Sequence, residues 1–286
     1  MNKFGDRKDG KRVKDINGMN HIMYHLGKSR CSNEVYIDYP IDVTNLVKYV
    51  ESINKKGDIH LTYFHVFCTA IGKVIYNRPL LNRFLVNGHF YDRNEVLISY
   101  VAKTSFEEKS SELMKVLKIK EEDNIYSICN KISGDVKKIR SNKSSSTDDL
   151  VSNIGNLPKP IRSIIAGFFK FLDRHGLLPV SMTRDILYYS SVIVSNLGSI
   201  NCKEAIYHHL SDFGTNSVFI TIGKIYEKEV YISGKTEIRS FCNFGITLDE
   251  RIADGFYFIK AINLLEYILN NPNLLEGKCN DKINIK

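Results

Sequence analysis

The segment from Thr247 to Gly255 most constrains how this chain can fold. It reads T-L-D-E-R-I-A-D-G and follows an apolar, strand-like run that ends at Leu248. After it, apolar residues recur at the spacing of one helix face: Phe258, Ile259, Ile262 and Leu265. The sequence therefore predicts a strand over 238–248, a polar turn, and an amphipathic helix over 256–269 that Asp254 can cap.

The rest of the chain alternates between strand and helix patterns, which indicates one large α/β domain. Between Lys3 and Asp15 there are six basic and three acidic residues without an apolar period. We therefore expect a mobile basic tail over 1–17, the domain over 18–276 and a C-terminal tail over 277–286. We predict strands at 34–43, 95–103, 191–195, 217–223, 229–232 and 238–248, and a hairpin at 84–94. We predict helices from a cap at Asp42 or Thr44 through Asn54, at 61–76, over most of 113–141, at 161–178 and at 256–269.

Composition sets limits on the class of protein. The 286 residues are 43% hydrophobic and 25% charged, as in ordinary globular proteins. The six cysteines are scattered without C-x-x-C spacing, which argues against a zinc site and a disulfide framework, and we expect a reducing, cytoplasmic environment and no bound metal. The net charge of +8 suits an anionic cofactor, whereas the tail has no aromatic residues regularly interleaved with its charges, so we expect no nucleic-acid partner.

Residues 161–178 form an unusually apolar segment. Arg162, Lys170, Asp173 and Arg174 interrupt it, so it does not have the pattern of a membrane-spanning helix. We expect a helix that packs against the body of the domain. The alternative is a weak association of this helix with a membrane surface.

Several short motifs, taken in series, resemble one family. They are D-E-R-I-A-D-G at 249–255, R-P-L-L-N-R at 78–83, S-N-L-G at 195–198, F-I-T-I-G-K at 219–224 and N-P-N-L-L-E at 271–276. In their order along the chain and in their spacing, these motifs resemble the catalytic domain of the dihydrolipoyl acyltransferases of 2-oxo acid dehydrogenase complexes and, more loosely, chloramphenicol acetyltransferase. The resemblance implies a mixed-sheet sandwich with flanking helices, a homotrimer, and an active site at the subunit interface that takes acyl-coenzyme A.

The resemblance also implies site residues. Ser195 matches the family serine or threonine whose hydroxyl stabilises the oxyanion of a tetrahedral intermediate. Asp254 matches the aspartate or asparagine that holds the site together, usually through an arginine, for which Lys28 and Arg30 are the basic candidates here. Glu250 stands where the family has its catalytic histidine, so this chain departs from the family at the general base.

That departure puts the chemistry in question. Imidazole titrates near pH 6.5, whereas an ordinary glutamate titrates about 4 units below a thiol, a mismatch of roughly 5–6 kcal/mol against proton transfer. Burial or a neighbouring carboxylate such as Asp249 would reduce this mismatch. His208 and His209 offer a second route, because they lie between the Ser195 turn and the following strand and can supply an imidazole.

Two functional hypotheses follow from the resemblance. In the first, the protein is a coenzyme A-dependent acyltransferase with an altered base, acting on a free small-molecule acceptor. In the second, it is an inactive enzyme homologue that serves as a trimeric scaffold or ligand-binding protein. The chain shows no lipoyl module, lipoyl attachment site or subunit-binding module, so we do not expect the core subunit of a 2-oxo acid dehydrogenase complex.

Overall fold

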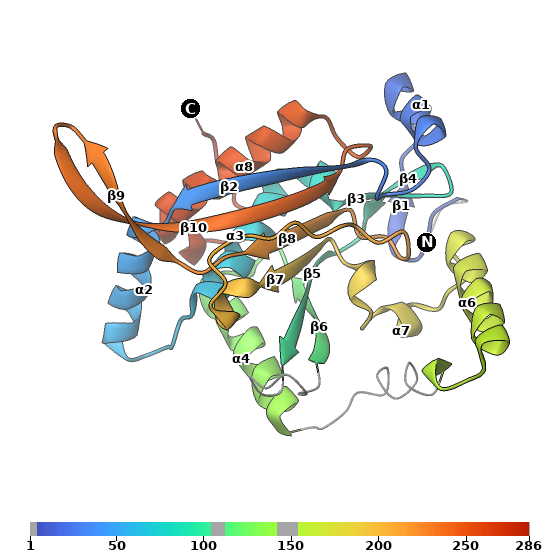
Figure 1. The fold of residues 1–286 in the computed structure, drawn as a ribbon, viewed down its shortest axis with the longest axis horizontal. Helices are drawn as coiled ribbons and strands as arrows, with labels where there is room; N and C mark the ends of the chain where they lie inside the picture. Colours follow the sequence, from blue (N-terminus) through green and yellow to red (C-terminus); the bar gives the residue numbers. More distant parts are fainter. Residues whose placement is uncertain (1–4, 104–111, 142–153, 286) are drawn as a thin grey trace.

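A computed structural model of the chain describes residues 5–103, 112–141 and 154–285 (Figure 1). Its main feature is a seven-stranded mixed sheet. Six strands follow in the order β2-β10-β8-β7-β5-β6, and the seventh, β9, pairs with the N-terminal part of β10. Strands β5, β7 and β8 run parallel to one another and the other pairs are antiparallel. The strands are β2 (Glu34–Asp42), β5 (Val96–Lys103), β6 (Glu112–Ile119), β7 (Val192–Asn196), β8 (Val218–Ile222), β9 (Tyr226–Ile232) and β10 (Lys235–Asp249).

Helices cover one face of this sheet, and the main hydrophobic core lies between them (Figure 1). These helices are α2 (Thr44–Lys56), α3 (Tyr63–Asn77), α4 (Ile125–Ser141) and α8 (Gly255–Asn270). Alternate strand residues such as Val194, Ile220 and Ile246 point into this core. The opposite face, which we call the outer face, carries a small cluster with Ile193 and Phe219. The expected mixed sheet with flanking helices is confirmed.

Local sequence explains where the core helices begin and end. The Thr62 hydroxyl accepts from the His65 backbone N–H, and the His65 ring accepts from the Thr62 N–H, so the two residues cap α3 reciprocally. Helix α2 ends at Gly57, whose φ of 81° favours glycine. The described residues also form short 3-10 helices at Pro79–Asn82, Leu187–Tyr189, Leu197–Ile200 and Pro272–Glu276.

A second, three-stranded sheet lies beside α1 (Gly18–Leu26) and has the order β1 (Gly10–Arg12), β4 (His89–Arg93), β3 (Arg83–Val86). The β3–β4 hairpin turns at Asn87 and Gly88, as predicted, and both have positive φ. Strand β1 lies within residues 1–17, which the sequence predicts to be a mobile tail. This part of the segment is instead ordered as a strand, because its backbone pairs with the open edge of β4. Likewise, in the C-terminal segment the Cys279 N–H donates to the Asp123 carbonyl.

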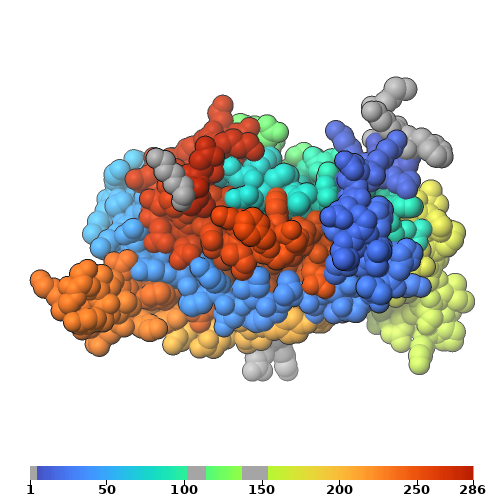
Figure 2. Space-filling view, turned by 90° about the horizontal axis from the view of Figure 1, so that it is seen from above, coloured from blue at the N-terminus to red at the C-terminus, as the bar shows by residue number. Residues whose placement is uncertain are grey.

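Two regions differ from the sequence predictions. Residues 112–119 form strand β6, paired along its length with β5, rather than the beginning of a long helix. Helix α6 (Lys159–Arg174), followed by α7 (Val180–Thr183), does form, but its apolar side is not packed against the body: Ile164 and Phe168 are 72% and 60% exposed. Figure 2 shows α6 in yellow-green at one end of the molecule and the β9–β10 hairpin in orange at the other. Among the described helices, none is long and apolar enough to cross a membrane.

Candidate functional site

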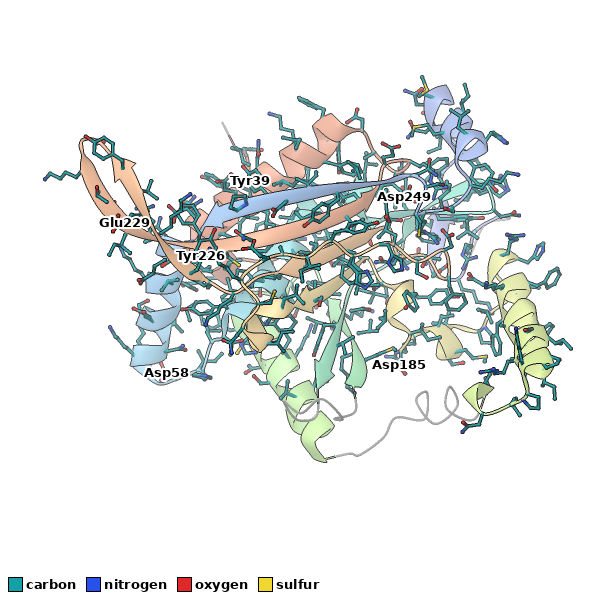
Figure 3. The ribbon with its side chains drawn as sticks, viewed as in Figure 1. Tyr39, Asp58, Asp185, Tyr226, Glu229 and Asp249 are labelled. Atoms are coloured by element: carbon teal, nitrogen blue, oxygen red, sulfur yellow. The ribbon has the colours of Figure 1, made fainter. Side chains whose placement is uncertain are left out.

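A buried ion pair fixes the turn between β10 and α8. The Arg251 Nε and Nη2 atoms each lie 2.8 Å from an Asp249 carboxylate oxygen, and the two side chains are 2% and 0% exposed. The same guanidinium donates through Nη1 to the carbonyls of Gly27 and Lys28, at 3.1 and 3.2 Å. This clamp ties the end of β10, marked by Asp249 in Figure 3, to the segment that precedes β2.

Glu250 lies between the two clamp residues and is exposed. Its backbone N–H donates to the Asn33 carbonyl at 2.9 Å, so the backbone is held in place. Within the described part of the chain, no hydrogen bond or ion pair involves its carboxylate. The structure thus presents an accessible carboxylate on a hydrogen-bonded turn, where a proton acceptor is expected from the resemblance.

Asp254 caps helix α8. Its carboxylate accepts from the Tyr257 backbone N–H at 2.8 Å, and the residue is exposed. Among the described residues, neither Lys28 nor Arg30 forms an ion pair with it. The arginine of this motif, Arg251, binds Asp249 instead.

Ser195 lies near the end of β7, half-buried, and by the alternation of the strand it points to the same outer face as Ile193. It is in register with Thr221 of β8, which pairs with Gly245 of β10. Glu250 follows five residues after Gly245, a separation of about 16 Å along the strand at roughly 3.3 Å per residue. One copy of the chain therefore does not bring Ser195 and Glu250 together.

His208 lies on the outer face between these two positions. Its ring stacks on Phe219 with centroids 3.9 Å apart, and its carbonyl accepts from the Thr247 hydroxyl at 2.7 Å. Its Nδ1 lies 2.8 Å from the His209 carbonyl. Donation from Nδ1 to this carbonyl leaves Nε2 free to accept a proton. His209 stacks on His208, and both are exposed.

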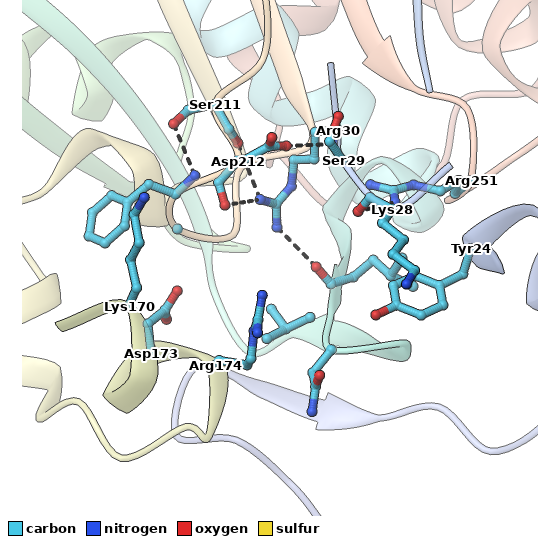
Figure 4. Close-up of a pocket in the computed structure, with 15 residues that line it drawn as sticks. Tyr24, Lys28, Ser29, Arg30, Lys170, Asp173, Arg174, Ser211, Asp212 and Arg251 are labelled. Carbon is cyan, nitrogen blue, oxygen red and sulfur yellow. Dashed lines mark hydrogen bonds between the residues drawn. The ribbon is translucent and has the colours of Figure 1, made fainter. Parts of the chain in front are cut away.

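A cavity of about 570 Å³ opens beside the clamp, between α6, the β3–β4 hairpin and the loop at 211–214 (Figure 4). We call it the basic pocket. Its charged lining residues are five cations and two carboxylates: Lys28, Arg30, Lys170, Arg174 and Arg251, with Asp173 and Asp212.

Arg30 lies at the centre of this lining and is 5% exposed. Its guanidinium donates to the backbone carbonyls of Ser211, Asp212 and Leu85, at 3.2, 3.3 and 2.9 Å, and its Nε has no partner. Burial lowers the pKa of Arg30, an effect that the negative charge of Asp249 partly offsets. Sequence reasoning singled out Lys28 and Arg30 as basic candidates but did not place them in a pocket with Lys170 and Arg174.

No cluster of three or more His, Cys, Asp or Glu side chains that could hold a metal ion occurs in residues 5–103, 112–141 and 154–285. The six cysteines are unpaired. The site therefore offers a carboxylate, a hydroxyl, an imidazole pair and a basic cavity as its chemical groups.

Residues 182–276 match the sequence profile of the 2-oxoacid dehydrogenases acyltransferase (catalytic domain). No curated protein sequence matches the chain. The fold is similar to that of a probable dihydrolipoamide acetyltransferase from Listeria monocytogenes 4b F2365, with a TM-score of 0.60, 17% identity and coverage of 92% of this chain and 95% of that one.

Two further structures have the same fold. The dihydrolipoamide acetyltransferase of Azotobacter vinelandii gives a TM-score of 0.60 at 12% identity, covering 93% of this chain and 94% of that one. A chloramphenicol acetyltransferase gives 0.55 at 9% identity, covering 88% and 92%. The chain thus has the fold of dihydrolipoamide acetyltransferase cores and chloramphenicol acetyltransferase, and its residues 182–276 carry the pattern of the 2-oxoacid dehydrogenase acyltransferase catalytic domain.

Proposed function

We propose that the protein is a homotrimeric, coenzyme A-dependent acyltransferase that acylates a small-molecule acceptor. The shared fold and the matched C-terminal pattern support this class of reaction. The Azotobacter structure was determined to study the catalytic roles of a serine, a histidine and an asparagine, the last two four positions apart. Glu250 and Asp254 have the same spacing in this chain.

The observation that carries the proposal is the separation of Ser195 from Glu250 within one copy. Both are accessible to solvent at least in part, yet about 16 Å of strand lies between their positions. A site that uses both groups needs Glu250 from one subunit and Ser195 from the next. Exposed apolar side chains between β7 and β8, Ile200, Ile206 and Tyr207, provide surface for such an interface.

The proposed reaction is attack of an acceptor hydroxyl or thiol on the thioester carbonyl of acyl-coenzyme A. The base takes the acceptor's proton as the new bond forms, and the Ser195 hydroxyl donates a hydrogen bond to the oxyanion. Collapse of the intermediate breaks the C–S bond and expels the coenzyme A thiolate, which takes the proton from the protonated base. Loss of one such oxyanion donor typically costs about 10²- to 10³-fold in rate. Glu250 is the first candidate base, and His208, through Nε2, is the second.

A second candidate function is that of an inactive homologue that retains the trimer and binds a ligand without turnover. The exposure of Glu250 favours this alternative, because a carboxylate in water is a much weaker base than a thiolate. The two functions differ in whether bound acyl-coenzyme A is consumed.

Calorimetric titration with coenzyme A and acetyl-coenzyme A tests the proposal first, with the subunit number determined by light scattering. Micromolar binding at one site per chain, in a trimer, is the expected result, and its absence would contradict the acyltransferase assignment.

Acyl transfer is then compared in Glu250→Gln and His208→Gln. Loss in Glu250→Gln with coenzyme A binding retained identifies Glu250 as the base. Full activity in that variant with loss in His208→Gln assigns the role to His208. Bound but unconsumed acetyl-coenzyme A, together with activity gained in Glu250→His, supports the inactive homologue.

A further inference from the structure

The charged residues that line the basic pocket are mostly cations, five against two carboxylates. Of its two carboxylates, Asp173 pairs with Arg7 at 3.1 Å, and Asp212 accepts from the Arg30 backbone N–H at 2.6 Å. Burial lowers the pKa of the Arg30 guanidinium, and the negative charge of both carboxylates raises it against that effect. Within residues 5–103, 112–141 and 154–285, Arg251 is the one of these five cations that forms an ion pair with a carboxylate, that of Asp249.

The other four cations have no carboxylate partner in the described part of the chain. The side chains of Lys28, Lys170 and Arg174 are exposed and, among the described residues, form no hydrogen bond or ion pair, and the side chain of Arg30 donates to backbone carbonyls. Like charges gathered around one cavity repel each other, and an anion between them relieves this repulsion.

Arg30 shows that the pocket is built rather than formed by chance among surface lysines. A buried charge is costly unless it is paired, yet three backbone carbonyls hold this guanidinium in place and leave Nε unpartnered. Burial also limits competition from water, which strengthens charge-assisted hydrogen bonds. Figure 4 shows the Arg30 guanidinium between the cations of α6 on one side and Lys28 on the other.

The size of the cavity sets the size of the ligand. About 570 Å³ lies within the range of roughly 300–1,000 Å³ that small-molecule sites occupy. Tyr24, Ser29 and Asn87 add neutral polar groups to the lining, which suits a ligand with hydroxyl or amide groups besides its anionic end.

We propose that the basic pocket binds a small molecule that carries a phosphate or carboxylate group, held by Arg30, Lys28, Lys170 and Arg174. The Arg251 clamp forms part of the same wall, so such a ligand lies next to the turn that carries Glu250. This inference does not depend on acyl transfer, because the pocket lies within one chain and binds an anion whether or not the site turns over.

Binding of inorganic phosphate and of succinate to the full chain tests the inference, by calorimetry at constant ionic strength. The pocket variant is Lys170→Gln/Arg174→Gln. The matched control is Lys159→Gln/Arg162→Gln, which removes the same charge from the same helix at positions that do not line the pocket. All four residues are exposed, so both variants should fold, which circular dichroism verifies.

We expect the wild type to bind at least one probe at one site per chain, and the two probes distinguish a phosphate from a carboxylate ligand. The pocket variant should bind at least about tenfold more weakly, and the control within about twofold of the wild type. Equal weakening in both variants, or no binding of either probe to the wild type, would overturn the proposal. A failure of the coenzyme A titration alone would leave it standing.

Discussion

Helices α8 and α6 both have sixteen residues and both are amphipathic, but the apolar side of α8 is buried and that of α6 is exposed. In α8, apolar residues including Ile262, Leu265 and Ile268 are buried in the main core. In α6, Ile164, Phe168 and Phe171 are exposed to solvent. The comparison teaches that a 3.6-residue period predicts a helix and its apolar side, but not what covers that side.

The attachments of the two helices explain the difference. Helix α8 follows strand β10 after a short turn, and the Asp249–Arg251 clamp and the Asp254 cap fix its beginning. At the C-terminal end of helix α6, Asp173 joins the helix to the body by pairing with Arg7. Its basic residues Lys170 and Arg174 face the basic pocket, so its polar side is the one turned to the body.

The largest effect on α8 should come from breaking the clamp at its start. Asp249→Asn leaves the Arg251 guanidinium buried without a counter-charge, which typically costs about 3–5 kcal/mol. Urea unfolding measures the loss. Glu250→Gln, one residue away and exposed, is the control and should change stability little. A loss below about 1 kcal/mol in Asp249→Asn would show that the pair does not hold the turn.

The next effect should come from the buried side of α8. Ile268 is fully buried, and Ile268→Ala removes three carbon atoms from a packed core, for an expected loss of about 2–5 kcal/mol. Thermal and urea unfolding measure it, with Ile268→Val as the milder control. If Ile268→Ala did not change the free energy of unfolding, the apolar side of α8 would contribute no more to stability than the exposed apolar side of α6.

A smaller effect should come from the cap. Asp254→Ala removes the acceptor for the Tyr257 N–H, and loss of such a cap typically costs about 1 kcal/mol. Asp254→Asn retains an oxygen acceptor and should keep most of that stability. If this conservative variant keeps its stability but loses acyl transfer, the charge of Asp254 has a role beyond capping.

The sequence predicted the α8 region well because every signal there is local. The strand, the polar turn, the capping Asp254 and the apolar period follow one another within about thirty residues, and the structure has them in this order. The sequence predicts a helix where strand β6 forms, because the charged residues of this segment resemble those of a solvated helix. The strand depends on pairing with β5, and the sequence of the segment itself does not indicate that pairing.

The candidate site could be predicted only in part for the same reason. Ser195, Glu250 and Asp254 stand in motifs, although their catalytic roles remain predictions. The Asp249–Arg251 pair was within the same motif but was not inferred from it. The residues that line the basic pocket come from segments between Tyr24 and Arg251 that lie far apart in the sequence. No local sequence pattern indicates that cations so far apart line one cavity.

The smallest effect should come from the exposed side of α6, and it tests the comparison from the other direction. Phe168→Ser replaces a ring that is 60% exposed, so the stability of the isolated chain should change by no more than about 0.5 kcal/mol. Unfolding measured over a range of protein concentrations also shows whether another copy covers this side, because subunit association makes stability depend on concentration. A loss above about 1.5 kcal/mol that grows with concentration would mean that α6 is buried between subunits, as α8 is buried within one.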